Sequence, residues 1–272
     1  MHSTRRILAA LLVGASLSAP TATAQPAPFN AMGVTMGHWH LISKDVEANT
    51  KIFLAMGGKL FMPGGSPLLM FPGIYINLVL NAEKGDGGTA GSVVNHVGFS
   101  VDNLQRRVAQ WKAAGVAVQP GADKRQAWVV TPDGVRIEIT EDRTQPIPIR
   151  GSHVHFLLPE AEIPEAAAWY ARTFGGTVST RSRTPVVDLP GVQLRFAKAD
   201  TRQAPTRHRV FDHFGVDVND HAAFVKRLDA AGIALDEPVR KSTAGNTVTY
   251  ITDAWGARVE IVQRAPLGAQ VQ

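Results

Sequence analysis

The sequence predicts an α+β fold built from four βαβββ modules, and internal repetition is the main observation behind this prediction. Three pairs of segments repeat in the same order along the chain: residues 94–102 with 211–219, 110–116 with 227–233, and 132–138 with 254–260. A second type of module begins with Gly-His-Trp-His at 37–40 and with Ser-His-Val-His at 152–155. Because self-similarity of this kind marks structural repeats, we expect a tandem duplication of a two-module unit.

The residue pattern within each module indicates the order of its elements. Alternation of apolar and polar residues at the start of the module is typical of a strand. In the second module, residues 104–114 then carry apolar side chains at helical spacing, and Gly115 ends the predicted helix. Three short strands are expected after it, at 116–118, 127–130 and 135–140, separated by Pro and Gly turns. Each module is therefore predicted to be βαβββ.

A proline-containing segment divides the chain into two predicted domains. Residues 144–150 include Pro146 and Pro148, and proline stiffens a chain while removing backbone donors. We expect a linker there, between a first domain at 30–143 and a second domain at 151–264.

The beginning of the chain is typical of a protein that is exported. Residues 1–24 have the pattern of a secretory signal peptide: Arg5 and Arg6, a short apolar segment, and Ala-Thr-Ala at 22–24 as a cleavage site. The apolar segment is too short to span a bilayer, so we expect no membrane anchor. The mature chain is predicted to begin at Gln25 and to be periplasmic or secreted. The arginine pair also resembles a twin-arginine signal, which exports proteins already folded.

Composition excludes several classes of function. The 272 residues include no cysteine, which rules out disulfides and thiolate metal ligands, so a metal site here must use His and carboxylates. The formal net charge is +5, and no basic run is interleaved with aromatic residues as a nucleic-acid groove requires. We therefore expect no nucleic-acid partner.

Histidine and glutamate recur at equivalent positions of the repeat. Three residues of the first half, His38, His96 and Glu138, are matched in the second half by His153, His213 and Glu260. Two neutral imidazoles and one carboxylate bind a divalent ion and leave coordination positions open for water or substrate. The alternative is that duplication has preserved packed, structural histidines.

This arrangement resembles the vicinal oxygen chelate superfamily. In that group βαβββ modules occur in pairs, with a His in the first strand of each module and a Glu in the last strand of the second module. This group includes glyoxalase I, fosfomycin-resistance proteins, bleomycin-binding proteins and extradiol dioxygenases. The resemblance covers essentially the whole mature chain and implies two half-open barrels with ligands inside. It implies a divalent ion of iron, manganese, zinc, nickel or cobalt. The expected ligands are His38, His96 and Glu138, with His153, His213 and Glu260 as a weaker second site.

A fourth ligand position distinguishes members of this superfamily. Glyoxalase I has a Glu in the last strand of the first module, whereas Asn77 and Arg195 stand at the aligned positions here. Glyoxalase I activity is therefore not expected. A cation such as Arg195 repels a metal ion, so we expect it to weaken the second site. Alternatively, its planar guanidinium holds a substrate carboxylate beside the metal.

Three further residues are candidates for catalysis. Because side chains alternate along a strand, His40 lies on the same face as His38, and it is either an acid/base group, a substrate donor or itself the ligand. Asn77 is expected to contact substrate or water. Tyr250 precedes Glu260 much as a Tyr precedes the ligand Glu of extradiol dioxygenases, although the acid/base His expected upstream of it is absent.

The sequence thus predicts an exported, metal-dependent enzyme that acts on a small oxygen-chelating substrate by lyase, isomerase or dioxygenase chemistry, as a monomer or homodimer. The rival hypothesis is a metal-free protein of the bleomycin-resistance type that sequesters a small molecule. In that case Trp39, Trp128 and Trp255 would supply stacking surfaces.

Overall fold

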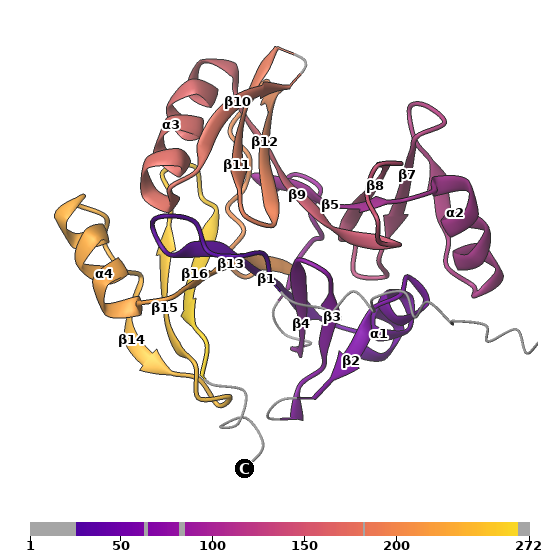
Figure 1. The fold of residues 1–272 in the computed structure, drawn as a ribbon, viewed down its shortest axis with the longest axis horizontal. Coiled ribbons are helices and arrows are strands. Elements are labelled where there is room, and N and C mark those ends of the chain that lie inside the picture. The colour runs from indigo at the N-terminus through magenta and orange to yellow at the C-terminus, as the bar shows by residue number, and fades with distance from the viewer. Residues whose placement is uncertain (1–25, 63–64, 82–84, 182, 266–272) are drawn as a thin grey trace, which may run out of the picture.

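The computed structural model describes residues 26–265, apart from 63–64, 82–84 and 182. Its described part consists of two eight-stranded sheets and four α-helices, which confirms the predicted α+β class (Figure 1). The predicted signal peptide at 1–24 lies outside the described residues. No described helix has both the length and the apolar character needed to cross a membrane.

The first sheet combines the first and fourth modules. Its strands follow the order β14-β15-β16-β13-β1-β4-β3-β2. Their bounds are β1 Val34–Ser43, β2 Lys59–Phe61, β3 Leu68–Phe71, β4 Ile74–Leu80, β13 Phe211–Val218, β14 Glu237–Lys241, β15 Thr247–Thr252 and β16 Arg258–Gln263. The two modules join where β1 pairs with β13 in antiparallel fashion.

The second sheet combines the second and third modules in the same way. Its order is β10-β11-β12-β9-β5-β8-β7-β6. The strands are β5 Val94–Val101, β6 Val118–Pro120, β7 Gln126–Val130, β8 Arg136–Glu141, β9 Ile149–Pro159, β10 Thr177–Arg181, β11 Thr184–Leu189 and β12 Val192–Ala199. Here β5 and β9 form the antiparallel junction. Neither sheet closes into a barrel, in agreement with the half-open form that the sequence predicted.

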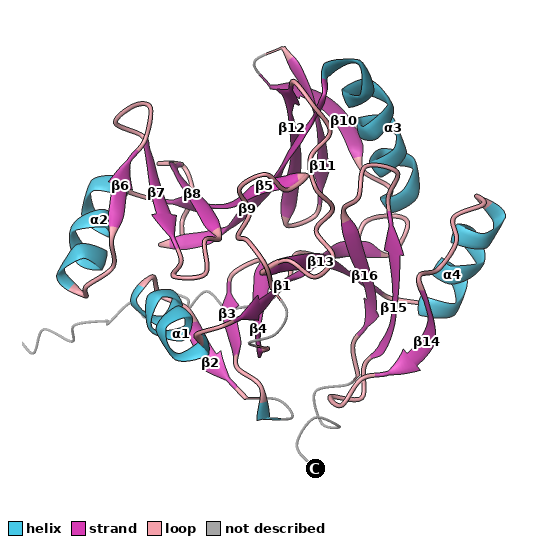
Figure 2. Cartoon of the chain, turned by 180° about the vertical axis from the view of Figure 1, so that it is seen from behind, coloured by secondary structure: helices cyan, strands magenta, loops and turns pink. Residues whose placement is uncertain are grey.

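Each module contributes one helix. The four are α1 Val46–Ala55, α2 Leu104–Ala113, α3 Ile163–Phe174 and α4 His221–Ala230. Asp45, Asn103 and Asp220 begin three of them, and each side chain accepts a hydrogen bond from a backbone N–H of the first turn. Gly175 ends α3 in the left-handed conformation, which glycine adopts without strain. Figures 1 and 2 show α3 and α4 at one end of the molecule, and α1 and α2 at the other.

The pairing of modules differs from the expected division into domains at 30–143 and 151–264. Each sheet takes one module from either half, so the two halves of the chain do not form separate sheets. The segment 144–150 is not a free linker either, because Gln145 is buried and its side chain bonds Ser100, and β9 already begins at Ile149. The first strand of each module has an open edge that must pair with another strand. Here β1 pairs with β13, which is distant in sequence, and β5 pairs with β9.

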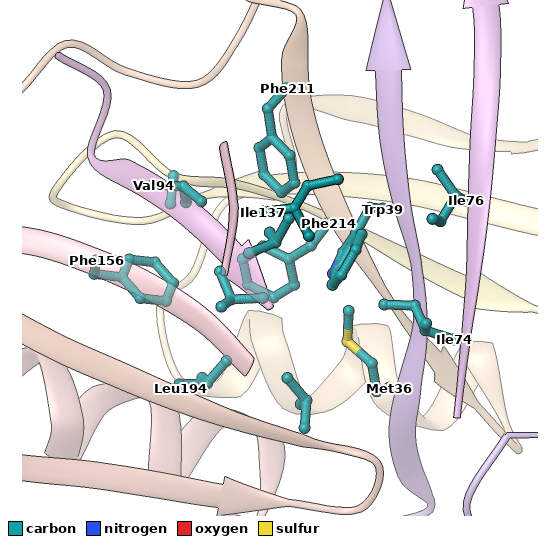
Figure 3. Close-up of a cluster of buried hydrophobic side chains, with 14 of the residues drawn as sticks. Met36, Trp39, Ile74, Ile76, Val94, Ile137, Phe156, Leu194, Phe211 and Phe214 are labelled. Atoms are coloured by element: carbon teal, nitrogen blue, oxygen red, sulfur yellow. The ribbon is translucent and has the colours of Figure 1, made fainter. Parts of the chain in front are cut away.

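A common hydrophobic core lies between the sheets (Figure 3). Trp39 of β1 packs against Phe99 of β5 with ring centroids 5.1 Å apart, and Phe156 of β9 lies 6.1 Å from Phe214 of β13. Because side chains alternate along a strand, the neighbours of these residues point to the opposite face of each sheet. The histidines occupy those alternate positions.

Candidate metal centre

Two clusters of His and Glu side chains occur, one on each sheet. The first, here called the Glu260 cluster, comprises His38, His40, His213 and Glu260. The second, the Glu138 cluster, comprises His96, Glu138, His153 and His155. In each cluster every residue offers one ligand atom within 4.8 Å of the others.

This grouping corrects the triads expected from the sequence. His38 does not join His96 and Glu138, and His153 does not join His213 and Glu260. His38 and His153 have thus exchanged partners relative to the expected triads. The reason is that β1, which carries His38, pairs with β13, and β9, which carries His153, pairs with β5. All six residues are still found in metal-type clusters, but each cluster draws on both halves of the chain.

In the Glu260 cluster, two imidazoles approach the same carboxylate oxygen. His38 Nε2 lies 2.9 Å from Glu260 Oε2, and His213 Nε2 lies 3.2 Å from the same atom. The ring of His40 stacks on that of His213 with centroids 4.4 Å apart. Gly215 makes room for this arrangement, because a Cβ at that position would overlap the His38 ring.

Two further side chains orient these groups. Asp212 Oδ1 lies 2.6 Å from His213 Nδ1, so Nε2 is directed at the cluster, and the Tyr250 hydroxyl donates to Glu260 Oε1 at 2.9 Å. A carboxylate behind a ligating imidazole is the usual support for a metal-bound histidine. Neither ring nitrogen of His38 has an aligned hydrogen bond among the described residues, although both are buried. A buried nitrogen without a hydrogen bond, aimed at a carboxylate, fits a divalent cation.

Protonation within the cluster also suits cation binding. Burial lowers the pKa of His38 and, helped by His213, lowers the pKa of His40 to about 3, so both rings are neutral at pH 7. Burial opposes the charge of Glu260, but its close contacts with His213 and His38 outweigh burial and hold its pKa well below the usual value. Burial likewise lowers the pKa of His213, yet Asp212 and Glu260 raise it overall. The cluster thus presents the ionised carboxylate of Glu260 and two neutral imidazoles, His38 and His40, while His213 lies between Glu260 and Asp212.

A cavity of about 270 Å³ opens beside the Glu260 cluster. Its lining brings together the three residues expected to take part in catalysis, His40, Asn77 and Tyr250. His40 and Asn77 are register partners on β1 and β4, so the aligned fourth position does reach the site. Arg240 also lines the cavity and approaches the Tyr250 hydroxyl at 3.3 Å.

The Glu138 cluster repeats the same backbone arrangement. His153 Nε2 lies 2.8 Å from Glu138 Oε2, and His96 Nε2 lies 3.2 Å from it. His155 packs on His96 with ring centroids 4.3 Å apart. Gly98 makes room for the His153 ring as Gly215 does for His38.

Two substitutions distinguish the Glu138 cluster from the Glu260 cluster. Arg195 Nη1 lies 3.8 Å from Glu138 Oε2, the oxygen that both imidazoles approach. Asn95, rather than an aspartate, contacts His96 Nδ1. A guanidinium this close to the shared carboxylate oxygen would oppose a divalent cation there through Coulomb repulsion. The Glu138 cluster is therefore the poorer cation site.

This placement reverses the expected ranking of the two sites. From the sequence, Arg195 was expected to weaken the site containing Glu260 and to leave the site containing Glu138 intact. Because the modules exchange partners, Arg195 of β12 faces Glu138, and Asn77 of β4 faces Glu260. The better candidate for a metal centre is consequently His38, His213 and Glu260.

Two supporting residues escaped the sequence analysis, although the sequence carries a signal for both. Asp212 immediately precedes His213, and the repeat places Asn95 at the same point, so an alignment of the repeats shows a change of charge directly beside the histidine. Gly215 is the second residue after His213 in a His-x-Gly pattern, and its need for space becomes evident only from the strand that crosses it.

The tryptophans proposed as stacking surfaces occupy other roles. Trp39 and Trp255 are buried, the first in the core between the sheets and the second against Trp169. Trp128 is partly exposed, with its ring beside His96 and beneath the guanidinium of Arg136. Two of the three thus serve packing, which removes most of the support for a metal-free aromatic cage.

Comparison with known proteins agrees with this architecture. Residues 152–261 match the model of the Glyoxalase/Bleomycin resistance protein/Dioxygenase superfamily. Glyoxalase I from Zea mays has a similar fold, with a TM-score of 0.68 and 16% identity over 85% of this chain and 92% of that chain. A protein from Bacillus subtilis with a provisional dioxygenase assignment gives a TM-score of 0.64 and 17% identity over 88% of this chain and 87% of that chain. At such identities the likeness concerns the fold alone, and no curated protein gives a significant sequence match.

The family domain matches the second half of the chain, the first half repeats the same modules, and the whole described chain has the corresponding fold. Residues 152–261 therefore form a domain of the Glyoxalase/Bleomycin resistance protein/Dioxygenase superfamily, and the described chain as a whole shares the fold of glyoxalase I.

Proposed function

We propose that the protein is an exported, metal-dependent enzyme of the vicinal oxygen chelate type whose reaction takes place at the Glu260 cluster. The observation that supports this most strongly is the approach of His38 and His213 to one oxygen of Glu260, at the edge of a cavity. A divalent cation held there would supply Lewis-acid stabilisation of negative charge on two neighbouring oxygens of a small substrate. Lyase, isomerase and dioxygenase reactions can all use such a chelate.

The surrounding side chains have separate tasks in this proposal. Asp212 and Tyr250 hold His213 and Glu260 in place, so their roles are positional. His40 is neutral and lines the cavity, where its ring can accept a proton or a hydrogen bond from a substrate hydroxyl. The amide of Asn77 can donate to a substrate oxygen from the neighbouring strand.

Metal content tests the proposal directly. The mature chain, residues 25–272, should contain about one equivalent of divalent metal, measured by elemental analysis of the purified protein. His213→Ala should lose it, whereas His96→Ala, the matched change in the Glu138 cluster, should retain it. Retention in His213→Ala with loss in His96→Ala would reject the Glu260 cluster. If the wild type held no metal, and added metal did not raise its Tm, the enzyme proposal itself would fail.

The class of reaction is best approached with a small panel of catechols and 2-oxoaldehydes assayed on metal-loaded protein. His40→Ala should keep its metal and lose activity by about 100-fold or more, since that is the usual contribution of a positioned acid or base. Activity that survives this substitution would exclude His40 from the reaction.

Export is a separate proposal that depends on residues 1–24. Arg5 and Arg6 followed by an apolar segment and Ala-Thr-Ala support a cleavable signal. Amino-terminal sequencing of protein recovered from the periplasmic or secreted fraction should begin at Gln25. Because every ligand of each cluster comes from one chain, a monomer suffices for the site, and a homodimer would bind the same amount of metal per chain.

A further inference from the structure

A second cavity, of about 700 Å³, is lined mainly by residues of the other sheet, and Arg195, which lines it, lies 3.8 Å from Glu138. Strands β8, β9 and β12 contribute to its walls, and four arginines line it: Arg125, Arg150, Arg181 and Arg195. The rest of the lining is mixed: it includes apolar side chains such as Leu189 and Val192, polar side chains, and the carboxylates of Glu141 and Asp142. Guanidinium groups are therefore concentrated around a partly apolar cavity.

The four arginines are of two kinds. Arg150 pairs with Asp142 at 3.2 Å, and Arg125 lies 3.9 Å from Glu141, so both have acidic partners. Arg181, by contrast, makes no ion pair within the described part of the chain, and it lies close enough to Arg195 to repel it. Arg125, Arg150 and Arg181 are exposed to solvent, so Arg195 is the one largely buried guanidinium among the arginines that line the cavity.

Arg195 is the central group of this arrangement. Its side chain is only 12% exposed, and its Nε donates to Gln193 Oε1 at 2.8 Å, which fixes the direction of the guanidinium. Its nearest acid is Glu138, at 3.8 Å, and that carboxylate is already shared with His153 and His96. Burial, with Arg181 nearby, lowers the pKa of Arg195 to about 10, so the group remains positively charged at neutral pH.

A buried cation beside a second cation is unfavourable unless an anion compensates it. We propose that this cavity is a binding site for a small organic carboxylate, held by the planar forks of Arg195 and Arg181. A guanidinium fork matches a carboxylate in bidentate geometry, and the apolar part of the lining suits a carbon skeleton better than an inorganic ion. The chain would then carry a metal centre on one sheet and an anion site on the other, with Arg195 standing where Asn77 stands in the first sheet.

This proposal does not rest on the proposed metal chemistry, because no residue of the Glu260 cluster lines the second cavity. It also explains why a single arginine replaces the fourth ligand position in only one of two otherwise equivalent clusters. Arg195 and Asn77 occupy the same register position on β12 and β4, opposite His155 and His40.

Calorimetric titration of the mature, metal-stripped protein with succinate tests the site, at constant ionic strength and with succinamide as the uncharged analogue. Succinate should bind saturably at one site per chain, and succinamide should not bind. Arg195→Gln should raise the Kd by about 10-fold or more, and Arg195→Lys, which keeps the charge but loses the fork, should also weaken binding. Arg181→Gln should weaken it as well.

Two controls locate the effect. Arg172→Gln removes a positive charge from the exposed surface of α3 and should leave the Kd unchanged. His213→Ala, which abolishes the proposed metal centre, should also leave it unchanged, so failure of one proposal can be told from failure of the other. The proposal is overturned if succinate shows no saturable binding, if Arg195→Gln binds as well as the wild type, if His213→Ala alone abolishes binding, or if inorganic phosphate binds more tightly than succinate.

Discussion

At the scale of single residues, Asn77 and Arg195 set the two clusters apart. Both occupy the position opposite the second histidine of a His-x-His strand, and the remaining ligand residues are the same in the two clusters. A neutral amide tolerates a divalent ion beside it, whereas a fixed guanidinium opposes one through Coulomb repulsion. This difference in charge, together with the exchange of Asp212 for Asn95, favours a cation at the Glu260 cluster over the Glu138 cluster.

Exchanging these residues should move the metal. Arg195→Asn is expected to create a second metal equivalent per chain, because the repulsion at Glu138 disappears, and Asn77→Arg is expected to abolish binding at Glu260. Elemental analysis of the two variants and of the double exchange measures the result. An Arg195→Asn protein that still binds one equivalent would show that the guanidinium is not what excludes metal from the Glu138 cluster.

Asp212 gives a second prediction at this scale. Asp212→Asn should lower metal affinity by about 10- to 100-fold, since the carboxylate orients His213 and increases its basicity. Competition with a chelator of known affinity measures the change. The matched control is Asn95→Ala beside His96, which should leave metal affinity unaltered; an equal loss from both changes would contradict the role given to Asp212.

At the scale of elements, the crossing of two strands places each cluster. Gly215 of β13 lies opposite His38 of β1, and the ring of that histidine fills the space where a side chain would stand. Gly98 of β5 has the same relation to His153 of β9. The glycine is thus part of the site, because without it the first histidine could not turn toward the carboxylate.

Gly215→Ala should therefore displace His38 and reduce metal binding, with a modest loss of stability of about 1–3 kcal/mol from overpacking. Gly98→Ala should cost similar stability, because its added Cβ meets the His153 ring, but should leave the metal content at one equivalent. Elemental analysis combined with urea unfolding separates the two effects. Full metal content in Gly215→Ala would show that His38 is not a ligand.

At the scale of the whole molecule, buried polar contacts tie the two sheets together. The turn between β15 and β16 carries Asp253, whose carboxylate accepts a hydrogen bond from the Tyr170 hydroxyl of α3. On the other side of the molecule, Asp133 accepts from Ser43 and from Asn49 of α1. Both contacts run between a turn of one sheet and a helix or strand end of the other.

Asp253 makes stability depend on pH. Burial raises its pKa from 3.8 to about 6, although hydrogen bonds from Tyr170 and the backbone act in the opposite direction. The folded state therefore binds a proton more tightly than the unfolded state, and this group increases stability as pH falls from about 6 to about 4. The gain at pH 4 relative to pH 7 is roughly 2 kcal/mol.

The substitution that isolates this effect is Asp253→Asn, which keeps acceptor and donor groups but does not titrate. Free energies of unfolding from urea titrations at pH 4 and pH 7, on metal-stripped protein, should show that the wild type gains roughly 2 kcal/mol relative to the variant at the lower pH. The same pH dependence in both proteins would contradict the raised pKa of Asp253.

Much of this protein could be predicted from its sequence. The repeated segments indicated four modules, and the order of apolar residues indicated βαβββ within each, because local periodicity reflects which face of an element is buried. The six ligand-type residues were also identifiable, since duplication placed His38 and His153, His96 and His213, and Glu138 and Glu260 at matching positions.

Only the tertiary structure decided how these residues combine. The residue pattern of β1 shows that this strand must pair with another at its edge. Its two candidate partners, β5 and β13, have nearly the same residue pattern, so the local sequence does not distinguish them. The choice of β13 over β5 depends on contacts between residues far apart in the chain, and on the single core that buries both sheets. That choice placed Arg195 beside Glu138 and Asn77 beside Glu260, and so determined which cluster can hold a cation.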